Sequence, residues 1–517
     1  MKPWAPVHSF PFSLGVGHVP CSTYWMIRLL TLLALLTLVS VRAQNSDSLP
    51  LTEDSRPHPD VPKGEQIKTT HKSGDKSIYP GTEREVTLYL PAGLDKTKPS
   101  AFMVFQDGVI YQAPVALDNL IHQKAIPPLV GIFVRPGVVP ATNEQALPRF
   151  NRSLEYDTVN GDYARFLLDE LLPALEKAHG LTFSKDGNQA AIAGSSSGGI
   201  AAWVAAWHRP DRFRRVYTSV GTYVGLRGGN DCASLVRKTE PKPIRLFLQD
   251  GSNDNNGYGG NWWIANQDML SALEWAGYEV NHAWGDGGHN QKHATVVFPE
   301  AMRWLWKDWA NTIEVKANAA TQSKWRGYEA LEPTGLWTKT GKAAGPGLKI
   351  DKGGNVSTTK LLNERSLLPD GSHVQPPPGS VVTGTTLSPD QTLLYFTVPD
   401  SAYVMCAQLH GEGRVRHTQK FIRLHEHDAQ DPKAGGMCVD VEGRIYVATA
   451  LGIQVSDQAG RVNFIIPTPG AATDVCFGGK DLNMLYVVAD GMIYQRPMKI
   501  KGVTSSQPPV KPAPPKL

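Results

Sequence analysis

Cysteine is scarce in this chain of 517 residues, which contains only 5. Cys21 lies near the N-terminus, and the other four, Cys232, Cys406, Cys438 and Cys476, are far apart, with no CxxC pair among them. A disulfide framework is indicated by an even number of cysteines at characteristic spacings, and a zinc site is indicated by closely spaced Cys or His ligands. The sequence therefore argues against both, and we expect neither a metal nor another cofactor.

The chain also has little excess charge, with a formal net charge of +4 and 41% hydrophobic residues. Its basic residues are too diffuse to form a phosphate-binding stripe, so we expect no nucleic-acid partner. This composition is typical of a globular protein. The length exceeds that of one ordinary core, which predicts two domains joined by linkers.

Long apolar runs are absent except at residues 29–39, near the N-terminus. Arg28 precedes this run, and a small-residue segment ending at Ala43 follows it, which is the pattern of a signal peptide over 1–43. The run is short for a membrane span, so we expect no stable span and a secreted or periplasmic protein; a retained anchor is the alternative. Met26 offers a second possible start.

Composition and periodicity divide the remainder into segments. Residues 44–66 are polar and proline-rich, which predicts a flexible leader, and 67–312 alternate strand-like and helix-like runs. We expect a linker over 313–335, an all-β domain over 336–503 and a disordered Pro/Lys-rich tail over 504–517.

The first domain has the pattern of a parallel sheet covered by helices. Residues 101–105 and 129–134 are continuous apolar runs, which suit strands that are buried on both faces. Leucine and phenylalanine recur at helical spacing over 162–179. We therefore predict an α/β fold with a mostly parallel sheet.

The segment GSSSG at 194–198 lies between an apolar strand-like run and a small-residue helix at 200–207. It fits the G-x-S-x-G turn, in which the glycines permit a sharp bend that exposes the central serine, here Ser196. An ordinary loop of glycine and serine is the alternative. The context of strand, turn and helix favours a nucleophile.

A serine nucleophile needs a histidine base and a carboxylate that orients it. In this architecture the order along the chain is serine, acid and histidine, each after the carboxyl end of a strand. Asp254 follows the run at 244–248, and His289 follows the run at 280–284 in a glycine-rich loop that lets it swing over Ser196. We predict a Ser196–His289–Asp254 triad.

Nearby residues compete for two of these roles. Asp250 is the alternative acid, but it lies at the end of the strand rather than on the loop. His282 and His293 are less favoured as the base, because we expect them in a strand and in a helix. For the oxyanion hole we predict the N–H groups of Ser197 and Gly108, which follow the nucleophile and the strand at 101–105.

Four motifs in order, FQDG at 105–108, GSSSG at 194–198, LQDGSND at 248–254 and GGH at 287–289, resemble the esterase D/enterochelin esterase group of α/β-hydrolases. The resemblance covers about residues 75–310. It implies an α/β-hydrolase fold and carboxylic-ester hydrolysis through the same triad. Members act on siderophore esters, on feruloyl and acetyl esters of polysaccharide and on small thioesters, so it leaves the substrate open.

Two further segments concern substrate binding. Arg152 and Glu155 resemble the Arg…Glu segment that lines the pocket mouth in this group, and an ion pair that holds a loop is the alternative. Trp262 and Trp263 follow the acid loop, where they could stack on an aromatic or sugar group; core packing is the alternative.

The motifs GMCVDVEGRIYV at 436–447 and VCFGG at 475–479 resemble the SMP-30/gluconolactonase family of six-bladed propellers, which hold a divalent metal. Two metal-ligand positions depart from the family, because Gly435 stands for an Asp and Thr383 for an Asn. The segment of about 165 residues suffices for about four blades. We expect a partial propeller without lactonase activity, whose edge strands are covered by the esterase domain or by self-association.

These observations predict a secreted serine esterase that acts on a small ester or on an esterified polysaccharide or siderophore. Two other functions remain alternatives. One is a metal-dependent lactonase in the C-terminal half, and the other is a non-catalytic binding protein.

Overall fold

The computed structural model describes residues 45–315, 336–351, 353–360, 368–426 and 432–514 of the chain. The predicted signal peptide at 1–43 and most of the predicted linker at 313–335 lie outside the described residues. Within the described residues no helix has the length and apolar character needed to cross a membrane.

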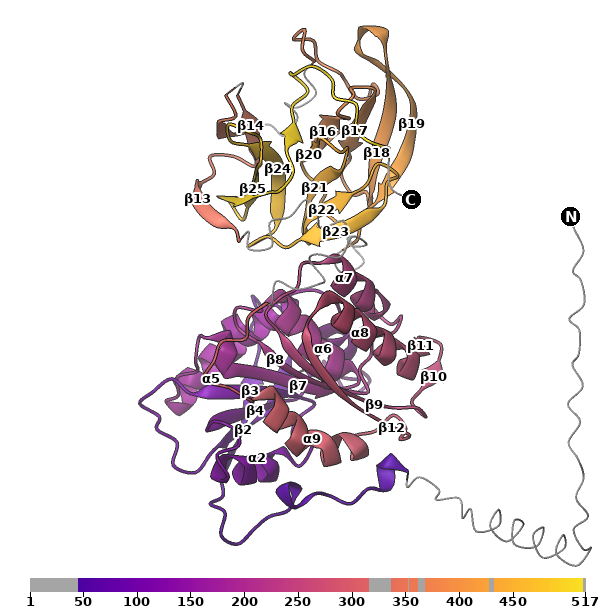
Figure 1. Ribbon diagram of the computed structural model, residues 1–517. Helices are drawn as coiled ribbons and strands as arrows, with labels where there is room; N and C mark the ends of the chain where they lie inside the picture. The colour runs from indigo at the N-terminus through magenta and orange to yellow at the C-terminus, as the bar shows by residue number, and fades with distance from the viewer. Residues whose placement is uncertain (1–44, 316–335, 352, 361–367, 427–431, 515–517) are drawn as a thin grey trace, which may run out of the picture. The chain divides into compact units, whose positions relative to one another are not determined.

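The first domain is built on a sheet that has ten strands within the described residues, in the order β12-β9-β8-β7-β3-β4-β2-β5-β6, with β1 paired to β2 (Figure 1). Neighbours from β12 to β4 run parallel, and the remaining pairs are antiparallel. This confirms the α/β fold class. The strands are β1 (Glu65–Lys72), β2 (Glu83–Leu90), β3 (Ala101–Gln106), β4 (Leu129–Val134), β5 (Val138–Val139), β6 (Arg149–Phe150), β7 (Ala190–Ser195), β8 (Arg215–Ser219), β9 (Arg245–Gly251) and β12 (Glu279–Gly285).

Helices cover both faces of this sheet, which is why β3, β4 and β7 consist almost entirely of apolar residues and glycine. In β3, Phe102 and Val104 pack in one hydrophobic cluster while Met103 and Phe105 pack in another, as the alternation of strand side chains requires. The first cluster includes residues of α4 (Asp162–Arg165), α5 (Leu172–His179), α6 (Ser197–His208), α7 (Cys232–Lys238) and α8 (Trp262–Ala276), and the second includes residues of α2 (Ala113–His122) and α9 (Lys292–Leu305).

The helix predicted over 162–179 is continuous but contains a π-helical segment, η3 (Phe166–Leu171), between α4 and α5. Gly180 ends it in the left-handed conformation, as glycine commonly does after a helix. Short elements complete the domain: η1 (Ser46–Ser48), η2 (Glu53–Ser55), α3 (Arg152–Tyr156), η4 (Gly187–Gln189), η5 (Gly229–Asp231), β10 (Asn256–Gly257) and β11 (Gly260–Asn261).

The segment that we predicted to be a flexible leader differs from that expectation from residue 46 onward. The Asp54 carboxylate accepts hydrogen bonds from Arg303 of α9 and from Gln123, both at 2.8 Å. The Asn119 side chain of α2 donates to the backbone oxygens of Asp54 and Arg56. Polar composition alone did not reveal these partners, because they lie far away in the sequence.

The C-terminal region is all-β, as predicted, and the strand pairs within its sheets are antiparallel. Within the described residues its sheets have the orders β13-β26-β25-β24, β14-β15, β16-β17-β18-β19 and β23-β22-β21-β20-β27 (Figure 1). Closure of a propeller stays a prediction. The strands are β13 (Thr338–Lys342), β14 (Gly347–Ile350), β15 (Val356–Thr359), β16 (Gly384–Leu387), β17 (Leu393–Thr397), β18 (Tyr403–His410), β19 (Arg414–Arg423), β20 (Met437–Asp440), β21 (Ile445–Thr449), β22 (Gly452–Ser456), β23 (Val462–Ile466), β24 (Ala472–Gly478), β25 (Met484–Ala489), β26 (Met492–Pro497) and β27 (Gly502–Val503), with a short η7 (Gly411–Gly413).

The tail predicted to be disordered also makes specific contacts. The Gln391 side chain donates to the backbone oxygens of Ser505 and Gln507, and Val510 N–H donates to Pro389 O. A proline-rich segment has few backbone N–H donors but keeps all of its backbone carbonyl acceptors, so donors on other segments can hold it in place.

Candidate active site

The turn between β7 and α6 places Ser196 in a conformation that few residues adopt. Its φ of 61° and ψ of −122° lie outside the common regions for a side chain with a Cβ. A Cβ on Gly194 would stand 2.2 Å from Gly198 O, and one on Gly198 would stand 2.8 Å from Gln106 Cβ. Both glycines are therefore required by close backbone approach, and the serine projects from the carboxyl end of β7.

His289 and Asp254 complete a chain of hydrogen bonds with this serine. His289 Nε2 lies 2.7 Å from Ser196 Oγ, and His289 Nδ1 lies 2.5 Å from Asp254 Oδ1. The Asp254 side chain is fully buried, whereas the imidazole is 22% exposed. With Nδ1–H donating to the carboxylate, Nε2 accepts the serine proton, which is the arrangement a general base requires.

The carboxyl groups of Asp250 and Asp254 interact directly, and because like charges repel, they cannot readily both be ionised. Burial raises the pKa of Asp250 well above its ordinary value, and a hydrogen bond and charge repulsion from Asp254 raise it further. A protonated Asp250 can donate to Asp254, while Asp250 Oδ1 accepts from Gly251 N–H at 2.7 Å. Asp254, and not Asp250, contacts the histidine.

The two competing histidines lie away from Ser196 Oγ. His282 is an exposed residue of β12 whose ring lies 4.8 Å from that of Trp284. His293 is buried at the start of α9, where Gln249 Nε2 lies 3.2 Å from its Nδ1. We predicted His282 in a strand and His293 in a helix, and the structure has them in β12 and α9.

Thr222 is a site residue that the sequence analysis missed. Its Oγ1 lies 3.3 Å from Ser196 Oγ and accepts a hydrogen bond from Trp262 Nε1 at 3.2 Å. Its backbone N–H donates to Ser196 O. Thr222 belongs to the loop after β8, and only the expectation that functional residues follow parallel strands could have drawn attention to it.

The two tryptophans occupy different environments. Trp262 is buried, and its ring centroid lies 5.7 Å from that of His289. Trp263 is half-buried, and its ring lies 5.3 Å from that of Trp284. Only Trp262 thus borders the serine–histidine pair directly.

The residues predicted for the oxyanion hole lie on two segments. Ser197 is the first residue of α6, where the N–H groups of the first turn have no partner within the helix. The Gly108 N–H donates to Val134 O at 3.1 Å, so this donor already has an acceptor, which does not favour a role in the oxyanion hole. That role of Gly108 stays a prediction. The preceding Asp107, with a φ of 66°, directs its N–H toward Tyr156 Oη at 3.5 Å.

Arg152 and Glu155 both form ion pairs. Two nitrogens of Arg152 donate to the Asp107 carboxylate at 2.8 Å each, so this arginine is tied to the loop after β3. Glu155 is fully buried and pairs with Arg84 at 2.7 and 3.1 Å, and it accepts from Gly137 N–H. Both residues thus form ion pairs that hold loops, and the pair of Glu155 is buried whereas the Arg152 side chain is partly exposed.

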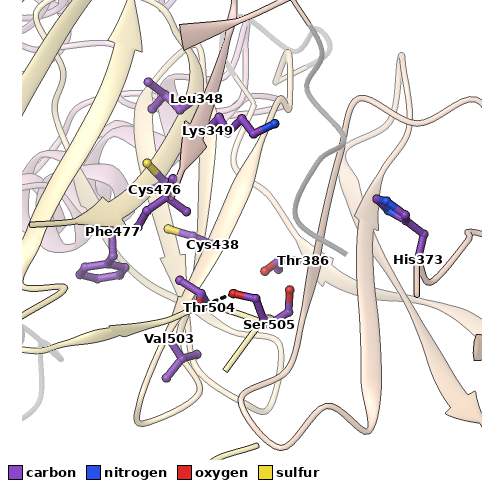
Figure 2. Close-up of a pocket in the computed structure, with 12 residues that line it drawn as sticks. Leu348, Lys349, His373, Thr386, Cys438, Cys476, Phe477, Val503, Thr504 and Ser505 are labelled. Carbon is purple, nitrogen blue, oxygen red and sulfur yellow. Dashed lines mark hydrogen bonds between the residues drawn. The ribbon is translucent and has the colours of Figure 1, made fainter. Parts of the chain in front are cut away.

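The C-terminal region contains a cavity of about 330 Å³, shown in Figure 2. The thiols of Cys438 and Cys476, which are not in disulfides, and the hydroxyl groups of Thr386 and Thr504 line it. No group of three or more metal-ligating side chains occurs within the described residues. The other lining residues are Leu348, Lys349, Ile350, His373, Phe477, Val503, Ser505 and Ser506.

The two positions that hold metal ligands in SMP-30-type propellers do not fit a metal here. The Thr383 hydroxyl donates to Ala434 O at 2.7 Å, and its oxygen also lies 2.9 Å from Thr397 Oγ1. Gly435 has no side chain, and a Cβ there would stand 2.0 Å from Thr473 O. A hard cation needs several oxygen ligands, which this pair does not supply.

The first domain has an α/β fold with a serine at the sharp turn between β7 and α6. Residues 77–324 match the family model described as "Putative esterase", and residues 366–490 match that of the "SMP-30/Gluconolactonase/LRE-like region". These two matches confirm the resemblances that the sequence motifs carry, to an esterase family over 77–324 and to SMP-30/gluconolactonase-like proteins over 366–490.

Curated relatives match the first domain. The chain is 29% identical over 249 residues to the iron(III) enterobactin esterase of Dickeya dadantii, covering 44% of this chain and 53% of the relative. It is 26% identical over 180 residues to the iron(III) enterobactin esterase of Escherichia coli K12, covering 34% and 40%. The chain thus spans about half or less of the length of these relatives.

Solved structures resemble the same part of the chain. The ferric enterobactin esterase of Salmonella typhimurium has a TM-score of 0.40 and 22% identity, covering 50% of this chain and 62% of that one. A ferulic acid esterase of Anaeromyces mucronatus has a TM-score of 0.39 and 17% identity, covering 52% and 99%. No functional conclusion follows from the structural likeness at these scores.

We predict that Asp250→Asn leaves the contact between Asp254 and His289 intact and changes the pH dependence of stability. The amide Nδ2 can donate to Asp254 as the protonated carboxyl does. Between the ordinary and the raised pKa, the native state holds a proton that the unfolded state has lost, so the free energy of unfolding of the wild type falls as pH rises, by up to about 1.4 kcal/mol per pH unit. The variant lacks this slope.

Urea unfolding of both proteins at pH 5, 6 and 7 measures the difference. The stability of the variant relative to the wild type should grow with pH. Parallel curves would contradict a protonated Asp250, and an Asp250→Asn variant as inactive as Asp254→Asn would contradict the assignment of Asp254.

We predict that Glu155→Ala destabilises the fold by about 3 to 5 kcal/mol, because Arg84 would be left as a buried unpaired charge. Glu83→Ala is the matched control, since Glu83 pairs with Lys72 on the surface, where such pairs contribute about 1 kcal/mol or less. Urea unfolding measures both. An unchanged unfolding curve for Glu155→Ala, together with a raised KM, would instead place Glu155 in substrate binding.

Proposed function

We propose that this protein hydrolyses carboxylic esters, with Ser196 as nucleophile, His289 as base and Asp254 as the acid that orients the base. The continuous hydrogen-bond chain from Ser196 Oγ to Asp254 is the observation that carries this proposal. It joins residues of three loops that follow β7, β9 and β12 at one edge of the sheet. The similarity to enterobactin esterases supports the same reaction class.

In the proposed mechanism Ser196 Oγ attacks the ester carbonyl carbon as His289 Nε2 takes the serine proton. The resulting oxyanion is stabilised by the N–H of Ser197 and the positive end of the α6 dipole, together with an N–H of the loop after β3. The imidazolium returns its proton to the departing alcohol, which leaves an acyl-serine. Water then loses a proton to His289 and attacks the acyl carbon. As the second tetrahedral intermediate collapses, the imidazolium gives this proton to the departing Ser196 Oγ, which restores the hydroxyl group and releases the acid.

Burial of Asp254 supports this chemistry. A carboxylate that is fully buried and hydrogen-bonded to Nδ1 stabilises the imidazolium that forms in each step. The Trp262 ring packs edge-on beside the imidazole, with 5.7 Å between the ring centroids, and so helps to hold its orientation. The protein supplies all of these groups itself, so the proposed reaction needs no metal.

For the substrate we propose an ester with an aromatic or otherwise apolar acid group, of the siderophore or feruloyl kind. Five large exposed apolar side chains lie on chain segments that come after the parallel strands in the sequence. These side chains are Val109 after β3, Phe150 and Leu154 after β4, and Tyr258 and Ile264 after β9. We also propose secretion, on the basis of the signal-peptide pattern that ends at Ala43.

We predict that Ser196→Ala lowers the kcat for a p-nitrophenyl ester by about 10⁴-fold or more, because the nucleophile is removed. Ser252→Ala, at an exposed serine of the acid loop, should retain wild-type activity and serves as the matched control. EDTA should have no effect on either protein. A panel of feruloyl, acetyl and siderophore esters then ranks the substrates.

Activity that survives in Ser196→Ala but disappears with EDTA would overturn the proposal and place the reaction in the C-terminal region. A wild type that neither hydrolyses any ester nor reacts with a serine-directed phosphonate would favour a binding protein.

A further inference from the structure

The loop that carries His289 is fastened to a segment about 240 residues earlier in the sequence. Ser46 N–H and Oγ both donate to Asp286 Oδ1 at 2.6 Å, and Ser46 Oγ accepts from Asp286 N–H at 2.7 Å. Ser46 is buried at this contact. These hydrogen bonds from Ser46 hold the pKa of the Asp286 carboxyl below its ordinary value, so Asp286 remains an anionic acceptor.

Asp47 contacts the residues on either side of the histidine. Its Oδ2 accepts hydrogen bonds from Gly288 N–H at 3.0 Å and from the Asn290 side-chain amide at 2.8 Å. The two donors flank His289 in the sequence, so one carboxylate oxygen fixes the backbone just before the imidazole and the side chain just after it.

The glycines of this loop are explained by the same contact. A Cβ on Gly285 would stand 2.2 Å from Ser46 Oγ, and a Cβ on Gly287 would stand 2.2 Å from Asp47 Oδ1. We interpreted the glycine-rich sequence as a loop that lets the histidine swing. The close approach of Ser46 and Asp47 gives these glycines a different purpose, because a side chain at either position would displace the N-terminal segment.

The opposite side of the loop is also held. Asn253 N–H donates to Gly287 O at 3.1 Å, and a Cβ on Gly251 would stand 2.2 Å from that same oxygen. The His289 loop therefore lies between the acid loop, which carries Asp254, and the segment that contains Ser46 and Asp47.

The N-terminal segment is itself anchored a few residues later. Asp54 pairs with Arg303 of α9 at 2.8 Å, and this salt bridge is partly buried. The segment thus has one end on the histidine loop and the other on a helix of the esterase domain, so it can transmit the rigidity of the domain to the loop.

We infer that Asp47, assisted by Ser46, is a positioning residue that holds His289 in register with Ser196 and Asp254. This inference rests on the proposed function. Glycine-rich loops have high conformational freedom, and a general base must be held within roughly 0.5 Å of its productive position. The predicted cleavage after Ala43 would leave only Gln44 and Asn45 ahead of Ser46, so maturation at that site preserves the contact.

The test compares Asp47→Ala, Asp47→Asn and the control Glu53→Ala in the mature chain. Glu53 lies in the same segment but is exposed and pairs only locally, with Arg56. We measure kcat and KM for a p-nitrophenyl ester and hydrogen exchange of the amides at 285–290. Asp47→Ala should lower kcat by about 10-fold or more with little change in KM, because a misplaced general base slows chemistry rather than binding.

Asp47→Ala should also speed exchange of the Gly288 amide, whose acceptor it removes. Asp47→Asn should restore most of the kcat and the slow exchange, because the amide oxygen can accept the same two hydrogen bonds. Glu53→Ala should match the wild type in both measurements.

Three results would overturn the inference. They are a wild-type kcat in Asp47→Ala, whether or not the loop exchanges faster; unchanged exchange at 285–290; and an Asp47→Asn variant as impaired as Asp47→Ala. The exchange measurement does not require activity. An inactive wild type with protected loop amides would therefore defeat the proposed function separately, while unprotected amides would defeat the contact itself.

Discussion

The sharp turn at Ser196 is the constraint on which the site depends. A residue with a Cβ at a φ of 61° costs about 1 to 3 kcal/mol and persists only where the surroundings enforce it. Here β7 and α6 enforce it from both sides, since Gly194 lies against Gly198 and Gly198 against Gln106 of β3. Burial of the two apolar faces of the sheet offsets this strain. The strained conformation directs the Ser196 hydroxyl group toward His289.

A second constraint is electrostatic, and it shows why two neighbouring carboxyl groups behave differently. Asp254 accepts hydrogen bonds from His289 and from the Asn255 N–H, and these donors stabilise its negative charge. Asp250 is equally buried, but repulsion by Asp254 and desolvation raise its pKa. A proton on Asp250 turns that repulsion into a hydrogen bond, and the pair carries a single charge that faces the imidazole.

Local patterns predicted much of this fold, and long-range contacts account for what they missed. The apolar runs at 101–105 and 129–134 became β3 and β4, because a strand covered on both faces has little freedom in composition. The motif order placed Ser196, Asp254 and His289 on the loops that follow β7, β9 and β12, and the loop after β8, which carries Thr222, lies between the first two. Composition failed for residues 46–56 and 505–513, because polar and proline-rich segments are ordered by partners that periodicity does not reveal. Thr222 was missed for a different reason, because no sequence motif marks it.

The C-terminal region differs from the metal site of SMP-30-type propellers in its packing as well as in the residues at the ligand positions. Replacing Gly435 with the family's aspartate would bring a Cβ within 2.0 Å of Thr473 O, so the backbone has closed over the place where a carboxylate would stand. Thr383 is similarly engaged with Ala434 and Thr397. The nearby buried acid, Asp474, accepts from the N–H groups of Leu348 and Val475 and so serves the packing of strands. A single substitution at Gly435 or Thr383 would therefore not rebuild the family's ligand set at this place.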